Sequence, residues 1–411
     1  MEQNRTILIN LILFVIVLML IIAGLTWANY SFAIANTGSN DFLPRWNGAH
    51  EWLLNGNNPY ARATSLVAEK MVYGRHARLL HGEDQMNFSY PIYAMVIYAP
   101  FGLLDYPLAR AYWMTALEIS IFLLVLLGLR LVEWKLRWKS LAWVIIFGMT
   151  WYFSLRAIME GSFTVVSVLL IIGTLLCIKT KHDLLAGALI AFATIKPQLS
   201  YLLILFIILW SIRSNRHKIW LSFILTLIIM IGMGLIMLPG WPISWLKQLM
   251  KIPGIYEWKG TAVLTLAKAM PGIQQQTATI ISIILYSYLV FEWLRAKGND
   301  FNAFLWTAFV TLIITNFVAA MAESQHQVVL MPAIFLVSKV LVDRLGLLGR
   351  WSALLLISTI FTGTWTLFLL THHGNQESHI MLIPLPVILL IGCWWIRWWV
   401  VKPPTRFQEL G

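Results

Sequence analysis

Charged residues are scarce in this sequence of 411 residues: they make up 12% of it, whereas hydrophobic residues make up 59%. A soluble domain of this length needs a charged surface, so the composition excludes a water-soluble globular protein. Apolar runs of about 20 residues, each long enough to cross the hydrocarbon core of a bilayer, recur along the chain. We therefore expect an all-α polytopic membrane protein that forms a single integral membrane domain over residues 1–411.

Cysteine is scarcer still, and phosphate-binding loops are missing. Cys177 and Cys393 are the only cysteines, and both fall in apolar runs, which argues against a disulfide framework or a thiolate metal site. The sequence contains no Walker motif and no Gly-rich phosphate loop, so energy coupling through an ATPase domain is not expected. The net charge of +12 indicates cytoplasmic loops and anionic lipid headgroups as partners, and no nucleic acid.

Basic clusters between the apolar runs predict the orientation of the chain, because cytoplasmic loops are enriched in Lys and Arg. With the cluster at Lys135–Lys139 inside, the runs give about twelve transmembrane helices and place both termini in the cytoplasm. The predicted spans are about 7–28, 110–132, 141–155, 163–178, 185–195, 198–212, 219–238, 273–294, 301–320, 328–342, 351–370 and 380–401. Residues 91–104 are ambiguous, and we assign them to the outer face as a partly embedded helix or a re-entrant segment.

This topology leaves two long loops on the outer side. The first, residues 29–109, is long enough to be functional and is expected to contain juxtamembrane helices. The second, residues 239–272, carries four lysines: Lys247, Lys251, Lys259 and Lys268. Either these lysines meet an anion, or they reflect the fact that long translocated loops ignore the charge rule.

The most informative stretch of the first loop is Asp41–Tyr60. It begins with a carboxylate, continues with the basic-aromatic pair Arg45-Trp46, and ends in the turn Asn55–Pro59. Four apolar residues between these points recur at helical spacing: Trp46, Ala49, Leu53 and Leu54. The pattern predicts a short helix along the membrane surface that stops at the Asn/Gly cluster. Asp41 stands just before it, where a carboxylate is either an N-cap or a functional group.

Polar residues at the outer ends of apolar runs are the other candidates, because charge at membrane depth is costly and often functional. Lys196, followed by Pro197 and Gln198, is either a lysine that snorkels from a turn or a ligand for a lipid phosphate. The segment Glu323–Gln327, which contains His326, is either a polar turn or a group that shares a proton or holds a phosphate.

Two further polar segments have less specific patterns. Arg156 and Glu160 are one helical turn apart, which favours an ion pair over a substrate contact. The last outer loop carries Glu377 and three histidines, His372, His373 and His379. Their spacing matches no metal-ligand geometry, so we interpret the segment as an exposed polar loop.

Taken together, these motifs resemble the GT-C superfamily of membrane glycosyltransferases. The closest resemblance is to the glycosyltransferase 87 family, which includes mycobacterial polyprenyl-phosphate-mannose-dependent mannosyltransferases. The motifs that carry it are Asp41-Phe42, Trp46, Leu53–Gly56, Asn58–Tyr60, Phe88-Ser89-Tyr90-Pro91, Lys196-Pro197-Gln198, and Gln325-His326-Gln327 followed by Val328–Pro332. The chain has Arg45-Trp46 where family members often have paired tyrosines, and Gly161-Ser162 where Gly-Gln is common. These departures bear on which sugar is transferred and which acceptor is used, more than on the class of reaction.

The resemblance implies a GT-C-like bundle and a hexosyltransferase that works without a nucleotide. One candidate carboxylate without a paired acidic cluster argues against a required divalent metal, and no other cofactor is expected. The donor would be a polyprenyl-phosphate sugar, of mannose or another hexose, and the acceptor a lipid or glycan, with inversion at the outer face of a bacterial cell membrane. Asp41 would be the general base, and Lys196, His326 and Arg45 would bind the donor phosphate. The remaining substrate-binding candidates are Trp46, Asn58, Tyr60, Tyr90, Gln198, Glu323 and Gln327.

Two other classes of protein compete with this interpretation. A transporter or flippase of a lipid-linked glycan also needs outer basic residues and polar groups in the membrane. The long first loop and the lack of an evident internal repeat argue against it. A purely structural membrane protein leaves the Asp41–Tyr60 motif unexplained.

Overall fold

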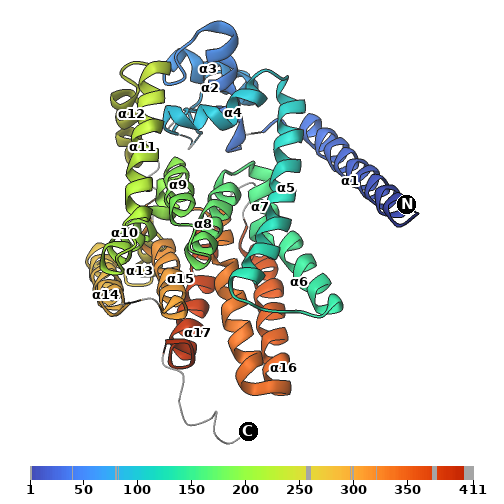
Figure 1. Ribbon diagram of the computed structural model, residues 1–411. Helices are drawn as coiled ribbons and strands as arrows, with labels where there is room; N and C mark the ends of the chain where they lie inside the picture. The colour runs from blue at the N-terminus through green and yellow to red at the C-terminus, as the bar shows by residue number, and fades with distance from the viewer. Residues whose placement is uncertain are drawn as a thin grey trace, which may run out of the picture. The chain divides into compact units, whose positions relative to one another are not determined.

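The computed structural model describes residues 2–38, 40–78, 81, 83–255, 261–296, 298, 300–320, 322–372 and 377–401. Within these ranges the chain is helical and contains no β-strand, which confirms the all-α prediction (Figure 1). The chain divides into two compact units. Unit 1 consists of residues 1–119, 158–162 and 240–250, and unit 2 of residues 120–157, 163–239 and 251–411.

The elements of unit 1 come mostly from the N-terminal part of the chain. They are α1 (Glu2–Ala35), α2 (Phe42–Asn55), α3 (Arg62–Tyr73), the 3₁₀ turn η2 (Ile92–Ala94), α4 (Met95–Gly102), the first half of α5 (Tyr106–Leu131), the end of α7 (Tyr152–Glu160) and most of α12 (Trp241–Ile255).

The elements of unit 2 form the larger helical body. They are the remainder of α5, α7 and α12, then α6 (Trp138–Thr150), α8 (Thr164–Lys179), α9 (Asp183–Phe192), η3 (Ala193–Ile195), α10 (Pro197–Arg213), α11 (Lys218–Met237), α13 (Ala262–Ala267), α14 (Gln274–Arg295), α15 (Phe301–Val318), η4 (Ser324–Leu330), α16 (Met331–Thr371), η5 (His379–Leu382) and α17 (Pro384–Val401).

Within the described ranges, seven helices are long and apolar enough to cross a membrane, or eight if α6 and α7, bent by 47°, form one span. Helices stand at the predicted positions, but the predicted count of about twelve crossings is not confirmed. Three of the predicted crossings, in α8, α9 and α10, correspond to helices too short for this criterion. Another two are joined in α16, which breaks at Gly346 (φ 55°, ψ −119°), inside the predicted cytoplasmic turn.

The core of unit 2 is centred on α15, whose residues from Phe304 to Val318 are all buried. Its apolar face packs against α10, α14 and α17. The Trp306 indole donates a hydrogen bond to the Cys393 carbonyl at 2.7 Å, which ties α15 to α17. Elsewhere in the unit, α9 and α11 approach closely because position 187 is glycine: a Cβ there would lie 2.2 Å from the carbonyl oxygen of Ile219.

In unit 1, α2 lies beside α3 and α4 (Figure 1). The predicted helix stop is confirmed: α2 ends at Asn55, and Gly56 takes the left-handed conformation (φ 67°) that glycine adopts without strain. The buried face of α2 lies toward its N-terminal end, where Phe42 stacks on Trp113 with ring centroids 5.6 Å apart. Leu53 and Leu54, which the apolar spacing assigned to the same face as Trp46, are exposed.

Helix α12 packs against the predicted first outer loop. Trp241 makes an edge-to-face contact with Tyr93 at 5.7 Å, and the Trp245 indole donates to the Ser89 carbonyl at 3.0 Å. The Gln248 amide donates to the Tyr60 carbonyl at 3.3 Å. Part of the predicted second loop therefore folds together with the first.

Two of the four lysines of the predicted second loop, Lys247 and Lys268, are exposed. Lys259 and the side chain of Lys251 lie outside the described residues.

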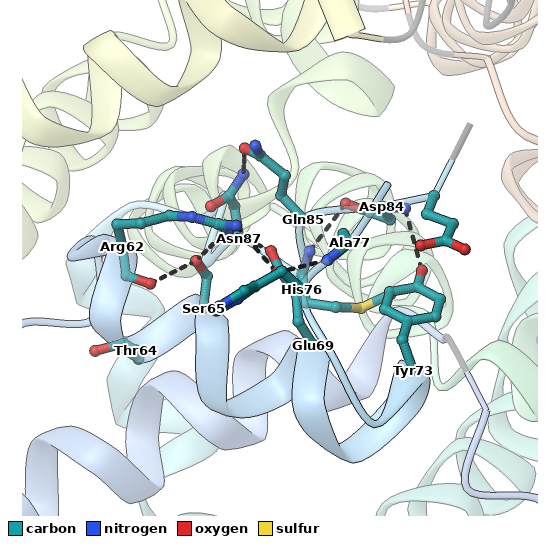
Figure 2. Close-up of polar contacts among 12 residues, drawn as sticks. Arg62, Thr64, Ser65, Glu69, Tyr73, His76, Ala77, Asp84, Gln85 and Asn87 are labelled. Atoms are coloured by element: carbon teal, nitrogen blue, oxygen red, sulfur yellow. Dashed lines mark hydrogen bonds and ion pairs between the residues drawn. The ribbon is translucent and has the colours of Figure 1, made fainter. Parts of the chain in front are cut away.

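The segment that follows α3 is held by a buried carboxylate (Figure 2). Glu69 is fully buried and accepts hydrogen bonds from the Arg62 guanidinium and from the Ala77 backbone N–H, the latter at 2.9 Å. Nearby, Arg75 binds both oxygens of Glu83 at 2.7 and 2.8 Å. This hydrogen-bonded pair lowers the pKa of Glu83 to about 2. The loop between α3 and η2 is thus an ordered polar structure in its described part.

Candidate active site

Asp41 does not cap the helix that it precedes. Its backbone is already helical (φ −64°, ψ −29°), and its side chain makes no capping hydrogen bond. The cap is the neighbouring Asn40, whose Oδ1 accepts from the N–H groups of Phe42 and Leu43 at 3.1 and 3.0 Å. The Asn40 amide in turn donates to the Tyr106 hydroxyl at 2.8 Å. The ordinary explanation for a carboxylate at this position is therefore excluded, and the Asp41 side chain is 19% exposed.

Arg45 lies one helical turn after Asp41 and connects it to Tyr90. Its Nη1 is 4.0 Å from the Asp41 Oδ1, and its guanidinium lies over the Tyr90 ring, 4.4 Å from the centroid. Burial opposes the charge on Arg45, but the attraction of Tyr90 and Asp41 outweighs burial and raises its pKa. The carboxylate of Asp41 thus has a permanently charged neighbour on the same helix face.

Three of the predicted substrate-binding residues in unit 1 form hydrogen bonds or ring contacts with other residues of that unit. The Trp46 indole donates to the Leu104 carbonyl at 3.0 Å, and its ring stacks on His50 at 4.7 Å. The Asn58 Oδ1 accepts from the Tyr60 N–H at 2.9 Å within the turn after α2. The Tyr60 hydroxyl donates to the Tyr90 carbonyl at 2.8 Å. These contacts explain why the Asn58–Tyr60 and Phe88–Pro91 motifs occur together: one holds the backbone of the other.

Gly161, which precedes the position where the chain has Ser162 in place of the glutamine common in the family, packs directly on α2. It adopts φ +63°, and a Cβ at this position would lie 2.6 Å from the Cβ of Phe42. Its carbonyl accepts a hydrogen bond from the Trp113 indole at 2.8 Å. Only glycine fits both the backbone conformation and the space beside the residue that follows Asp41.

We expect Gly161→Ala to lower the free energy of unfolding of unit 1 by roughly 1–3 kcal/mol, because it combines left-handed strain with overpacking against Phe42. Thermal unfolding in detergent measures the change. Gly240→Ala is the matched control, since Gly240 also has positive φ (+81°), but a methyl group added there would meet no other described part of the chain within 4 Å. Equal losses in the two variants would show that the contact with Phe42 contributes nothing.

In unit 2, Lys196 lies between η3 and α10, with Pro197 at the first turn of α10. Its side chain is only 2% exposed, so it does not snorkel to the surface. The ammonium donates to the Thr164 hydroxyl at 3.1 Å and lies 3.9 Å from the Glu323 Oε2. The structure thus brings together Lys196 and the Glu323–Gln327 segment, which are far apart in sequence.

The Glu323–Gln327 segment begins with a capping box rather than a simple turn. The Glu323 side chain and the His326 side chain each accept from the other residue's backbone N–H, and His326 Nδ1 is the acceptor at 3.4 Å. The other ring nitrogen, Nε2, lies 3.3 Å from the Glu323 Oε2. Gln325 donates to the same oxygen at 2.8 Å. Lys196, Gln325 and His326 therefore surround one carboxylate oxygen.

The two predicted glutamine ligands differ in their surroundings. Gln327 is buried and donates to the Leu382 carbonyl at 3.0 Å, a contact that holds η4 against η5. Gln198 is half-buried at the start of α10, two residues after Lys196, and its side chain makes no hydrogen bond to another described residue.

A second carboxylate beside η4 was missed at the level of sequence. Glu377, which the sequence pattern assigned to an exposed loop, accepts from the Tyr152 hydroxyl at 2.8 Å and from the Ser324 hydroxyl at 2.6 Å. Its Oε2 also lies 3.8 Å from the Arg156 Nε. Glu377 thus anchors the residue that follows Glu323.

Among the described residues, no group of three or more His, Cys, Asp or Glu side chains is placed to hold a metal ion.

Comparison with known proteins identifies the family. The profile of glycosyltransferase family 87 matches residues 88–321, more than half of the 411-residue chain. The chain belongs to glycosyltransferase family 87. No match was found among curated proteins or among solved structures. The membrane helices and the family together make this family 87 protein an integral membrane glycosyltransferase.

The family match covers only part of the candidate site. Tyr90, Lys196 and Gln198 lie inside the matched region, whereas Asp41 and His326 lie outside it. The family therefore supports the class of reaction. The roles proposed for individual residues of this family 87 chain rest on the chemistry and the surroundings of each side chain.

Proposed function

We propose that this family 87 transferase moves a hexose, with mannose as the first candidate, from a polyprenyl-phosphate donor to a lipid or glycan acceptor. The transfer inverts the anomeric centre and takes place on the outer face of a bacterial cell membrane. The observation that carries the proposal is the Asp41 carboxylate, which stands at the start of α2 without capping it. A carboxylate relieved of this structural role is suited to act as a general base.

In the proposed reaction, Asp41 accepts the proton of the acceptor hydroxyl while the hydroxyl oxygen attacks the anomeric carbon. The bond between that carbon and the phosphate oxygen breaks, and its electron pair leaves with the polyprenyl phosphate. Negative charge develops on the departing phosphate, and preorganised hydrogen-bond donors stabilise it most effectively where water is excluded. Lys196, which is buried, and His326 fill this role, with Arg45 as a further candidate.

The remaining candidates support the substrate in different ways. We propose that Gln198 reaches it directly and that Glu323, which lies 3.9 Å from the Lys196 ammonium, acts at the phosphate-binding position. The Arg45 guanidinium lies over the Tyr90 ring and holds the ring in position for contact with the substrate. The other four candidates have an indirect role, because each side chain forms a hydrogen bond that fixes nearby backbone. They are Trp46, Asn58, Tyr60 and Gln327.

The test is sugar transfer by purified protein reconstituted in lipid, with labelled polyprenyl-phosphate sugars as donors and a membrane-lipid extract as acceptor. We expect a labelled glycoside from at least one hexose donor and none from nucleotide sugars. Movement of labelled donor across the bilayer without a new glycosidic bond would instead establish the transporter. Absence of both products with every donor would contradict the proposed function.

A further inference from the structure

Three buried polar side chains lie around the Glu323 carboxylate. Lys196, Gln325 and His326 are each at most 5% exposed. All three converge on the same Oε2 atom, at 3.9, 2.8 and 3.3 Å respectively. The backbone N–H of Glu323 donates to His326 Nδ1, which assigns the ring proton to Nε2, the atom nearest the carboxylate. Gln325 donates a hydrogen bond to this oxygen, and the buried Lys196 ammonium and His326 Nε2 both lie within 4.0 Å of it, so a carboxylate of the chain itself occupies a buried, donor-rich position.

We propose that Glu323 occupies the position of the donor phosphate and is displaced by that phosphate when the lipid binds. This inference rests on the proposed function, and it gives Glu323 a more specific role than direct contact with the substrate. A phosphate oxygen accepts hydrogen bonds from lysine, amide and imidazole donors as a carboxylate oxygen does. The phosphate and Glu323 therefore compete for the same three groups.

The surroundings of Glu323 allow such an exchange. A buried lysine without a counter-charge is strongly unfavourable, so the resting enzyme needs an anion beside Lys196. Glu323 is the more exposed partner, at 20%, whereas Lys196 is held in place by its hydrogen bond to Thr164. The carboxylate can turn toward solvent while the cation stays. Ser324 is anchored to Glu377, so the backbone of the segment remains in position during the exchange.

The experiment measures binding of undecaprenyl phosphate to nanodisc-reconstituted wild type and Glu323→Gln. Glutamine keeps a side-chain oxygen for the capping box but removes the negative charge. We expect the variant to bind undecaprenyl phosphate about tenfold more tightly, because the competing anion is gone. Undecaprenol, which lacks the phosphate, is expected to bind equally to both proteins. Inorganic phosphate, tested as a competitor, distinguishes a site for the headgroup alone from one that also needs the lipid.

Glu133→Gln is the matched control, because Glu133 also pairs with a lysine, Lys179, at 2.8 Å within unit 2. It is expected to leave binding unchanged. Unchanged or weaker binding by Glu323→Gln, in a wild type that does bind undecaprenyl phosphate, would overturn the inference and leave the proposed function standing. An equal gain for undecaprenol would also overturn it. If neither protein binds the phosphate lipid, the proposed donor itself is wrong.

Discussion

Asp41→Asn is expected to reduce the rate of sugar transfer by about 10²–10⁴-fold, the range over which a positioned general base contributes. Asparagine has nearly the shape of aspartate but cannot accept the proton of the acceptor hydroxyl. Because Asn40 caps α2, the substitution removes no capping hydrogen bond. The variant should therefore fold and bind donor like the wild type. Single-turnover transfer, donor binding and thermal unfolding are measured on the same preparations.

The adjacent residue supplies a control with the opposite expected result. Asn40→Ala removes the cap and should lower the free energy of unfolding by about 1 kcal/mol. The folded fraction of that variant retains the carboxylate of Asp41 and should still transfer sugar. Wild-type rates in Asp41→Asn would refute Asp41 as the base. Unfolding of Asp41→Asn to the same extent as Asn40→Ala would show that Asp41 has a structural role after all.

The second large effect is expected for Lys196→Met, which keeps most of the volume of the side chain and removes its charge. We expect kcat/KM to fall by about 10²–10³-fold, as it does when a group that stabilises developing negative charge is lost. Stability should also fall, because Glu323 loses its buried partner. Transfer assays with the polyprenyl-phosphate donor and thermal unfolding report the two effects separately.

A double variant separates catalysis from stability. In Lys196→Met/Glu323→Gln neither charge is present, so stability should return toward the wild-type value while transfer stays low. Recovery of transfer in the double variant would mean that Lys196 serves only to neutralise Glu323. Lys179→Met is the matched control: it breaks the Lys179–Glu133 pair elsewhere in unit 2 and should leave kcat/KM unchanged.

Local features of the fold were predictable from the sequence because their causes are local. The Asn/Gly cluster after α2 predicts a helix end, and Gly56 provides it with a positive φ. The short basic segment between two apolar runs predicts a break, and Gly346 lies within it. Apolar length indicates which segments are membrane helices. It does not determine how many cross, since α8, α9 and α10 are short.

The parts of the site that escaped prediction depend on contacts between distant residues. Glu377 and Tyr152 are 225 positions apart, and no local pattern relates them. The choice of Asn40 over Asp41 as the cap follows from the backbone conformation of Asp41, since both residue types are good caps. Leu53 and Leu54 have the spacing of a buried face but are exposed, because the aromatic partners of α2 lie near Phe42. Tertiary packing decided these cases.

The three-part composition of unit 1 has a consequence for biogenesis. Its last piece, Gly240–Met250, leaves the ribosome only after many residues of unit 2 have been made. At roughly 5–20 residues per second, the nascent first loop waits on the order of 10 s for Trp241 and Trp245 to arrive. During that interval the side of Tyr93 that Trp241 later covers has no partner from α12. Unit 1 is therefore incomplete during this interval, and slowing synthesis between residues 119 and 240 would prolong that state.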